Sequence, residues 1–165
     1  MDKNDVIAPY LALDVEIDHV PYHLEVEATK RLIDILREDL QLASTKVSCE
    51  IGRCGACSVL VNGRLVNACL TLAYHLDGAK VETIVSLSKG KLDPIQQAFM
   101  EEGGFQCGYC TPGMVMATKA LLDEKPNPTR EEIKQGLSGN LCRCTGYAGI
   151  IRAVEKAAQM TSKQS

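Results

Sequence analysis

Hydrophobic and polar residues alternate over residues 11–26, LALDVEIDHVPYHLEV, on either side of a turn near Asp18 to Pro21. Alternation of this kind places the apolar side chains on one face of a strand, so the segment predicts a β-hairpin. A second hairpin is predicted in VLVNGRLV, where Asn62-Gly63 is a strong signal for a type I′ turn. The short segment KVETI, residues 80–84, is one more predicted strand.

One predicted helix lies between the hairpins, in TKRLIDILREDL at residues 29–40. Thr29 is a residue type that caps helix starts, and the apolar side chains of this segment recur at helical spacing. These side chains are Leu32, Ile33, Leu36 and Leu40. Strands around a single helix predict a small α+β domain over residues 1–84.

The pattern becomes helical in the second half of the chain, after the polar linker SLSKGKL at residues 86–92. An Asp-Pro pair opens the first helix, a Thr-Pro pair the second, and a capping box of Thr129 and Glu132 the third. The predicted helices cover residues 93–103, 111–124, 129–137 and 147–160. Short helices with short connections predict an all-α four-helix bundle over residues 85–165.

Composition and charge narrow the class of protein without identifying it. The 165 residues are 45% hydrophobic and 24% charged, as in folded proteins of one or two small domains. The net charge of −3 comes from interspersed acidic and basic residues, so nucleic acid is not an expected partner. No apolar run approaches the roughly 18 residues of a membrane span, so no membrane association is expected. Residues 1–14 lack the features of a secretory signal, and we expect a cytoplasmic protein.

Eight cysteines carry the candidate chemistry, and they fall into two separate groups of four. The first group is Cys49, Cys54, Cys57 and Cys69, and the second group is Cys107, Cys110, Cys142 and Cys144. A reducing compartment disfavours four structural disulfides, so metal binding is the stronger interpretation.

The first group has the spacing C-x4-C-x2-C followed by a distant cysteine, which is that of plant-type [2Fe–2S] ferredoxins. Gly52, Gly55 and Ala56 allow the backbone of this loop to curl close to a cluster and direct N–H groups towards its sulfur atoms. A zinc ribbon, the alternative, pairs two C-x-x-C hooks and fits this spacing poorly. The first group therefore predicts a [2Fe–2S] site.

The second group joins a C-x2-C pair to a distant C-x-C pair, and this spacing alone does not choose between iron and zinc. A thioredoxin-like redox pair would leave Cys142 and Cys144 unexplained and would need a βαβ context that the pattern lacks. In CGYCTPGMVMATKALL and in LCRCTGYAGIIRAVEKAA, a cysteine pair and a threonine precede an amphipathic segment. Two such helices packed together would gather four thiolates at their N-termini, where N–H groups and partial positive charge stabilise them.

The motifs FQCGYCTPGM and GNLCRCTGY, after CEIGRCGACSV, resemble those of the small iron–sulfur subunit of the molybdenum hydroxylases. This family includes xanthine dehydrogenases, aldehyde oxidoreductases and carbon monoxide dehydrogenases, and the resemblance spans residues 10–160. It implies a plant-type ferredoxin-like (β-grasp) domain followed by a four-helix bundle, with one [2Fe–2S] cluster in each. The implied ligands are Cys49, Cys54, Cys57 and Cys69 for the first cluster and Cys107, Cys110, Cys142 and Cys144 for the second.

The resemblance also implies contacts with other cofactors and subunits. Gln106, through its side-chain amide, and Cys144 would contact a molybdopterin cofactor held by a large partner subunit. Electrons would pass from molybdenum to the bundle cluster, then to the ferredoxin-like cluster, and on to FAD in a medium-sized subunit. The chain would have no catalytic residue of its own, in a hetero-oligomer such as a dimer of heterotrimers. Ser48, which stands where the family usually has Gly, would reshape the loop or tune the cluster potential.

The substrate of such a complex is not specified by these residues, because the resemblance implies that the residues that select it lie in the large subunit. Xanthine or a related purine or N-heterocycle is the favoured class, and an aldehyde, carbon monoxide or an aromatic thioester is the alternative. Two other classes of protein stay open: a free-standing two-cluster carrier, and an adaptor stapled by zinc without redox function. Mutation of any ligand cysteine is expected to destabilise its own half of the chain.

Overall fold

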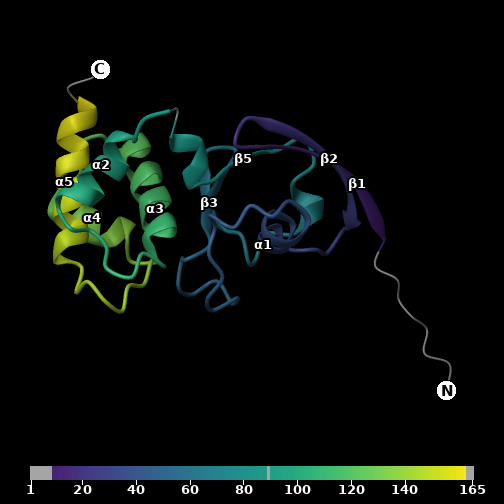
Figure 1. Cartoon of the computed structure of the whole chain (residues 1–165), viewed down its shortest axis with the longest axis horizontal. Helices are drawn as coiled ribbons and strands as arrows, with labels where there is room; N and C mark the ends of the chain where they lie inside the picture. Colours follow the sequence, from purple (N-terminus) through teal and green to yellow (C-terminus); the bar gives the residue numbers. More distant parts are fainter. Residues whose placement is uncertain (1–8, 89, 163–165) are drawn as a thin grey trace.

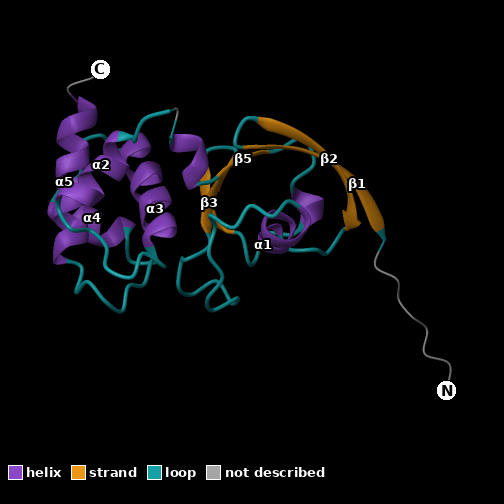
Figure 2. Cartoon of the chain, viewed as in Figure 1, coloured by secondary structure: helices purple, strands orange, loops and turns teal. Residues whose placement is uncertain are grey.

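Strands and helices separate along the chain, with the sheet in the first half and the longer helices in the second (Figures 1 and 2). The computed structural model describes residues 9–88 and 90–162. The ends of the two predicted domains, residues 1–8 and 163–165, and Lys89 of the predicted linker lie outside these described residues. A mixed sheet followed by a helical region agrees with the ferredoxin-like domain and helical domain expected from the sequence.

The described residues form one five-stranded mixed sheet. Its strands are β1 (Tyr10–Ile17), β2 (Val20–Glu27), β3 (Ser58–Val61), β4 (Arg64–Asn67) and β5 (Lys80–Glu82). The strand order is β2-β1-β5-β3-β4, in which β1 and β5 run parallel and all other neighbours run antiparallel. Both predicted hairpins are confirmed. Positive φ angles at Asp18 and His19 in the first turn, and at Asn62 and Gly63 in the second, are those of type I′ turns.

The helix of the first half begins later than the sequence pattern predicts. α1 covers Leu32–Asp34 and continues as a π-helical segment, η1, over Ile35–Asp39. The predicted cap at Thr29 is wrong, because Arg31 precedes the helix in an extended conformation and pairs with Leu72. This bridge to a later segment of the chain keeps the backbone extended at Arg31, so the helix cannot begin before Leu32.

The first hydrophobic core lies between the sheet and this helix. The predicted apolar face is confirmed, since Leu32, Ile33 and Leu36 are fully buried, while Leu40 packs partly buried at the edge. Two short 3-10 helices lie further along the chain: η2 covers Ala73–His75, and η3 covers Ile84–Leu87. The start of the predicted linker is therefore ordered, and Ser86 is buried within η3.

Four helices of the described residues pack around a second core. They are α2 (Pro94–Glu101), α3 (Thr111–Glu124), α4 (Arg130–Gly136) and α5 (Ala148–Ser162). The predicted starts are confirmed: Asp93 caps α2 with a capping box to Gln96, and Thr129 and Glu132 form the capping box of α4. The core side chains include Phe99, Met114, Ile133, Ile150 and Val154. None of the described helices is long and apolar enough to cross a membrane.

The first turn of α3 lies directly on the cysteine loop that precedes β3, and Figure 1 shows α3 beside β3. A Cβ atom added at Gly113 would lie 2.0 Å from the carbonyl oxygen of Gly55, so only glycine permits this approach. Gly55 has a φ of +68°, and a Cβ added there would lie 2.5 Å from Nδ2 of Asn140. At Gly113 and Gly55 the two halves of the chain therefore meet backbone to backbone.

Gly113→Ala is expected to lower the free energy of unfolding by about 1–3 kcal/mol, because the added methyl group forces α3 away from the loop. Denaturant unfolding of the full chain, followed by circular dichroism, measures this change. Gly139→Ala is the matched control, since no atom lies within 4 Å of a Cβ added at Gly139. Equal stability of the two variants would contradict the packing of α3 on the loop.

Candidate metal centres

The first cysteine group lies on the loop between η1 and β3 and on the segment that follows β4. Its thiols form two neighbouring pairs: Cys49 lies against Cys54, and Cys57 lies against Cys69. Cys54 is also close enough to Cys57 for their charges to interact. The structure therefore brings together all four cysteines of the predicted first group.

Hydrogen bonds and burial have opposite effects on the thiols of this group. Backbone N–H groups, that of Ile51 first, lower the pKa of Cys49 to about 6, and the N–H of Arg53 donates to its Sγ at 3.3 Å. Burial raises the pKa of Cys57 to about 11, and the neighbouring thiol of Cys69 adds to this effect. N–H groups aimed at sulfur stabilise thiolates, and a bound cation would offset the cost of ionising the buried pair.

Two side chains stabilise the conformation of this loop, and the spacing of the cysteines did not predict either of them. Nδ2 of Asn67, at the end of β4, donates to the carbonyl oxygen of Gly52 at 3.1 Å. Arg31 donates to Glu50 at 2.8 Å and also pairs with Asp34. Positive φ angles at Gly52 and Gly55 agree with the curled loop that their positions predict. Asn67 and Arg31 lie far from the loop in sequence, so only the fold reveals their role.

The second cysteine group lies where α3 begins and on the loop before α5. Cys110 is the residue that precedes the first turn of α3, as the sequence pattern predicts. The thiols again form two pairs: Sγ of Cys144 lies 3.7 Å from Sγ of Cys107, and Cys110 lies against Cys142. All four cysteines of the predicted second group therefore meet at one end of the helical half.

The pKa values of this group also reflect crowding of thiols. Burial raises the pKa of Cys110 to about 12, with further contributions from Cys142 and Cys107. The neighbouring Cys107 thiol raises the pKa of Cys144. For Cys142 burial acts in the same upward direction and is the largest single effect, but hydrogen bonds from Thr145, Cys144 and Cys110 together outweigh it and lower the pKa. Crowded thiols that raise one another's pKa values are stabilised when a cation replaces their protons.

The threonine that follows each cysteine pair adds a hydroxyl group to the site. Oγ1 of Thr145 donates to Sγ of Cys142 at 3.1 Å. Oγ1 of Thr111, at the corresponding place after Cys110, is buried and has no hydrogen-bond partner within the part of the chain that the structure describes. A buried hydroxyl group without a partner is costly, and a sulfur-rich group bound at this place would supply an acceptor.

The arrangement of each group fits a two-iron cluster. A [2Fe–2S] cluster is held by four thiolates, and four thiols arranged as two adjacent pairs match two irons better than one ion. Within residues 9–88 and 90–162, no three His, Cys, Asp or Glu side chains converge closely enough to hold a single metal ion. Both groups also consist of free thiols. Their donor chemistry and pairing fit the iron–sulfur clusters expected from the sequence.

Gln106 and the two outer cysteines of the second group are exposed. Gln106, Cys107 and Cys144 all lie on the surface, whereas Cys57 and Cys69 of the first group are buried. Both residues that the resemblance assigns to a pterin contact, Gln106 and Cys144, are thus exposed in this chain, and the contact itself stays a prediction. Ser48 is exposed as well, next to Cys49.

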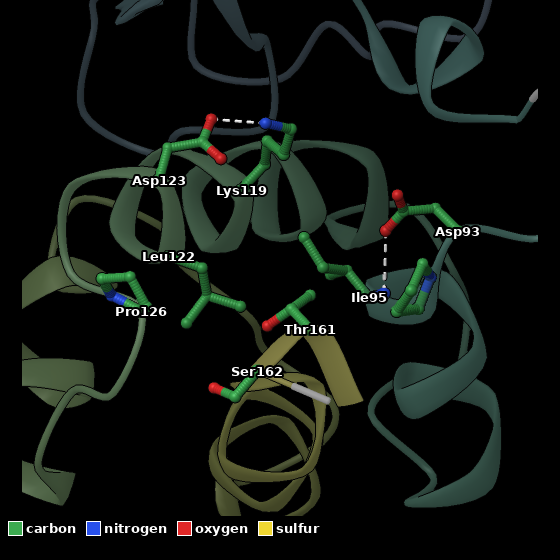
Figure 3. A pocket seen from close by; sticks show the side chains of 9 residues that line it. Asp93, Ile95, Lys119, Leu122, Asp123, Pro126, Thr161 and Ser162 are labelled. Carbon is green, nitrogen blue, oxygen red and sulfur yellow. Dashed lines mark hydrogen bonds and ion pairs between the residues drawn. The ribbon is translucent and has the colours of Figure 1, made fainter. Parts of the chain in front are cut away.

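A cavity of about 450 Å³ lies elsewhere, between α2, α3 and the end of α5 (Figure 3). Its lining includes Asp93, Leu122 and Thr161, and Lys119 there is paired with Asp123 across one turn of α3. None of the eight cysteines lines it. The charges in this cavity are satisfied within the chain, so the cysteine groups remain the candidate site.

Comparison with known families assigns both halves of the chain. Residues 15–83 match the family described as "2Fe-2S iron-sulfur cluster binding domain", and residues 83–155 match that described as "[2Fe-2S] binding domain". The fold and the two cysteine groups therefore define a class of protein with two [2Fe–2S]-binding domains.

Similar proteins narrow this class to one family. A probable xanthine dehydrogenase subunit of Bacillus subtilis (strain 168) is 61% identical over 76% of this chain and 72% of that protein. "Aldehyde oxidoreductase iron-sulfur-binding subunit PaoA" of Escherichia coli (strain K12) is 44% identical over 90% of this chain and 72% of that protein. A chain in the crystal structure of quinoline 2-oxidoreductase from Pseudomonas putida 86 superposes with a TM-score of 0.90 and 39% identity, covering 94% of this chain and 98% of that one.

The chain belongs to the small iron–sulfur subunits of the molybdenum hydroxylase family. Its role is that of an electron-transfer subunit in an oxidoreductase complex. This assignment argues against the two other classes that the sequence left open, the free-standing carrier and the zinc-stapled adaptor.

Cys107→Ser in the full chain is expected to abolish the second cluster and to lower the iron content from about four to about two per chain. The oxygen of serine is a poor substitute for thiolate, and one lost ligand exposes the cluster. Low-temperature EPR and an iron count measure the change. Ser138→Ala, an exposed change in the same half, is the control and should keep full occupancy. Wild-type occupancy in Cys107→Ser would contradict the ligand assignment.

Proposed function

We propose that the chain carries electrons from a molybdopterin centre in a large partner subunit, through its two clusters, to FAD in a third subunit. Each bound [2Fe–2S] cluster would supply one-electron redox chemistry, and the chain itself would supply the ligands. The proposed ligands are Cys49, Cys54, Cys57 and Cys69 for one cluster and Cys107, Cys110, Cys142 and Cys144 for the other. The observation that carries this proposal is the convergence of both groups into paired thiols on loops that touch each other.

The second cluster is the one we propose to lie next to the molybdopterin. Supporting this order, Cys107 and Cys144 are exposed together with Gln106, so a cofactor of another subunit can approach them. The amide of Gln106 offers a donor and an acceptor for the polar edge of a pterin. The role of this side chain would be to bind and orient the edge of the cofactor nearest the cluster.

Exposed apolar side chains flank the same cysteines and support docking of a large subunit there. Phe105 is 40% exposed, Tyr109 48% and Leu141 56%, all within two residues of a second-group cysteine. Apolar and aromatic side chains of this kind are enriched where proteins associate. In the assembled complex they would be covered, which would also exclude water from the cluster.

The division of the chain follows the two cores. We propose a plant-type ferredoxin-like (β-grasp) domain over residues 1–84 and a four-helix bundle, with its linker, over residues 85–165. Separate cores on either side of η3, and capping boxes that start α2 and α4, support this division. The assembly we propose is a cytoplasmic hetero-oligomer, such as a dimer of heterotrimers; the eight free thiols favour a reducing compartment.

Xanthine or a related N-heterocycle is the proposed substrate of the complex. The relative with 61% identity is named for xanthine dehydrogenase, and the related solved structure is named for quinoline. An aldehyde is the second candidate, because the relative with 44% identity is named for aldehyde oxidoreductase. Affinity purification of the tagged chain from its native host, with assays for molybdenum, FAD and xanthine-driven cluster reduction, tests this proposal. A chain that purifies with both clusters but without molybdenum would contradict the proposed molybdenum complex, and with it the proposed substrate.

Gln106→Ala in the assembled complex is expected to slow cluster reduction by substrate roughly tenfold, through loss of one oriented hydrogen bond. Both clusters should stay at full occupancy, because Gln106 is not a proposed ligand. Stopped-flow absorbance of the iron–sulfur bands measures the rate. Gln97→Ala is the matched control: Gln97 is an exposed glutamine on α2 that bonds to Glu101. An unchanged reduction rate in Gln106→Ala would remove the proposed contact.

A further inference from the structure

The two cysteine loops are bonded directly to each other across the joint between the halves of the chain. The N–H of Leu141 donates to the carbonyl oxygen of Cys54 at 2.8 Å. Nδ2 of Asn140 donates to the carbonyl oxygen of Gly55 at 3.0 Å. Asn140 and Leu141 immediately precede Cys142, so a ligand-bearing segment of the second group is attached to the loop of the first.

Asn140 is held in one position at this contact. It is only 4% exposed, and its Nδ2 also lies 3.4 Å from Oγ of Ser58, at the start of β3. The side chain fits where Gly55 leaves room, since a Cβ at Gly55 would lie 2.5 Å from the same nitrogen. A buried amide with its donors satisfied has a defined orientation, because losing these bonds would leave a buried polar group without a partner.

A further hydrogen bond ties the segment that carries Cys107 and Cys110 to the same loop. Tyr109, between Cys107 and Cys110, donates through its hydroxyl group to the carbonyl oxygen of Val47 at 2.5 Å. Val47 lies two residues before Cys49. Both segments of the second group, the one with Cys107 and Cys110 and the one with Cys142 and Cys144, are therefore hydrogen-bonded to the first loop. One contact lies at each end of that loop.

We infer that Asn140 and Tyr109 are positioning residues that fix the separation and orientation of the two cysteine groups. Neither side chain is a ligand, and both bonds cross between the halves instead of stabilising one half alone. Transfer of an electron between two centres depends steeply on their separation, so a fixed joint would keep that step fast and uniform. The inference rests on the proposed ligand groups, but the joint itself is a property of the chain.

Asn140→Ala in the full chain, with both clusters loaded, tests this inference in two ways. The amide of Leu141 should exchange its hydrogen with solvent roughly tenfold faster, because the bond beside it is lost. The magnetic splitting between the two reduced clusters in low-temperature EPR should weaken or broaden, since it depends on their separation and relative orientation. The iron content should stay at the wild-type level.

Asn67→Ala is the matched control, because Nδ2 of Asn67 also donates to a glycine carbonyl oxygen of the first loop, that of Gly52 at 3.1 Å. Asn67 belongs to the same half as that loop, so its loss should change the signal of the first cluster only. Exchange of the Leu141 amide should then match the wild type. Faster exchange in Asn140→Ala but not in Asn67→Ala supports the inference; equal behaviour of the two variants overturns it.

Tyr109→Phe keeps the test decisive if Asn140→Ala does not fold. This variant removes one oxygen atom from an exposed ring. The magnetic splitting between the two reduced clusters should weaken or broaden, as in Asn140→Ala. If Asn140→Ala misfolds, an unchanged splitting in the Tyr109→Phe variant overturns the inference. A wild-type chain without iron would overturn the ligand assignment instead, and exchange at Leu141 would still decide whether Asn140 fixes the joint.

Discussion

The close approach of α3 to the first cysteine loop is the constraint on which the rest of the structure depends. Gly113 and Gly55 meet without a side chain between them, and the carbonyl oxygen of Gly55 also accepts a bond from Asn140. Because Cys110 directly precedes α3, this contact sets where the second cysteine group lies relative to the first. If an added methyl group displaced α3, Cys107 and Cys110 would move away from the first loop together with the helix.

Metal binding is expected to be coupled to folding in such a chain. Each half is small, with its own modest core, and small domains of this size often need a metal or another staple for stability. The buried thiol of Cys57 and the half-buried thiol of Cys110 have raised pKa values, about 11 and about 12, so without metal they hold their protons. Binding of iron would displace those protons, and the bonds from iron to the thiolates would close both loops.

Local chemistry along the sequence predicted much of this arrangement. The Asn62-Gly63 turn and the Thr129 capping box depend on neighbouring residues, and each is found as expected. The cysteines of each predicted group lie further apart in sequence, but their spacing was distinctive enough to group them, and the fold brings the members of each group together. The helix start at Leu32 was missed, because Arg31 pairs instead with the distant Leu72. The bonds of Asn140 and Tyr109 also join segments far apart in sequence, and no local pattern carries them. Candidate ligands are thus predictable from the spacing of the cysteines, whereas the side chains that position their loops depend on the tertiary fold.

The most direct test of the account is low-temperature EPR of the dithionite-reduced full chain, with a count of iron and acid-labile sulfide. Two distinct rhombic signals, with about four irons and about four sulfides per chain, are the predicted result for two [2Fe–2S] centres. A single signal with about two irons, or a colourless chain containing zinc, would contradict the assignment of the second cysteine group. The route proposed for electrons through this subunit would then fail.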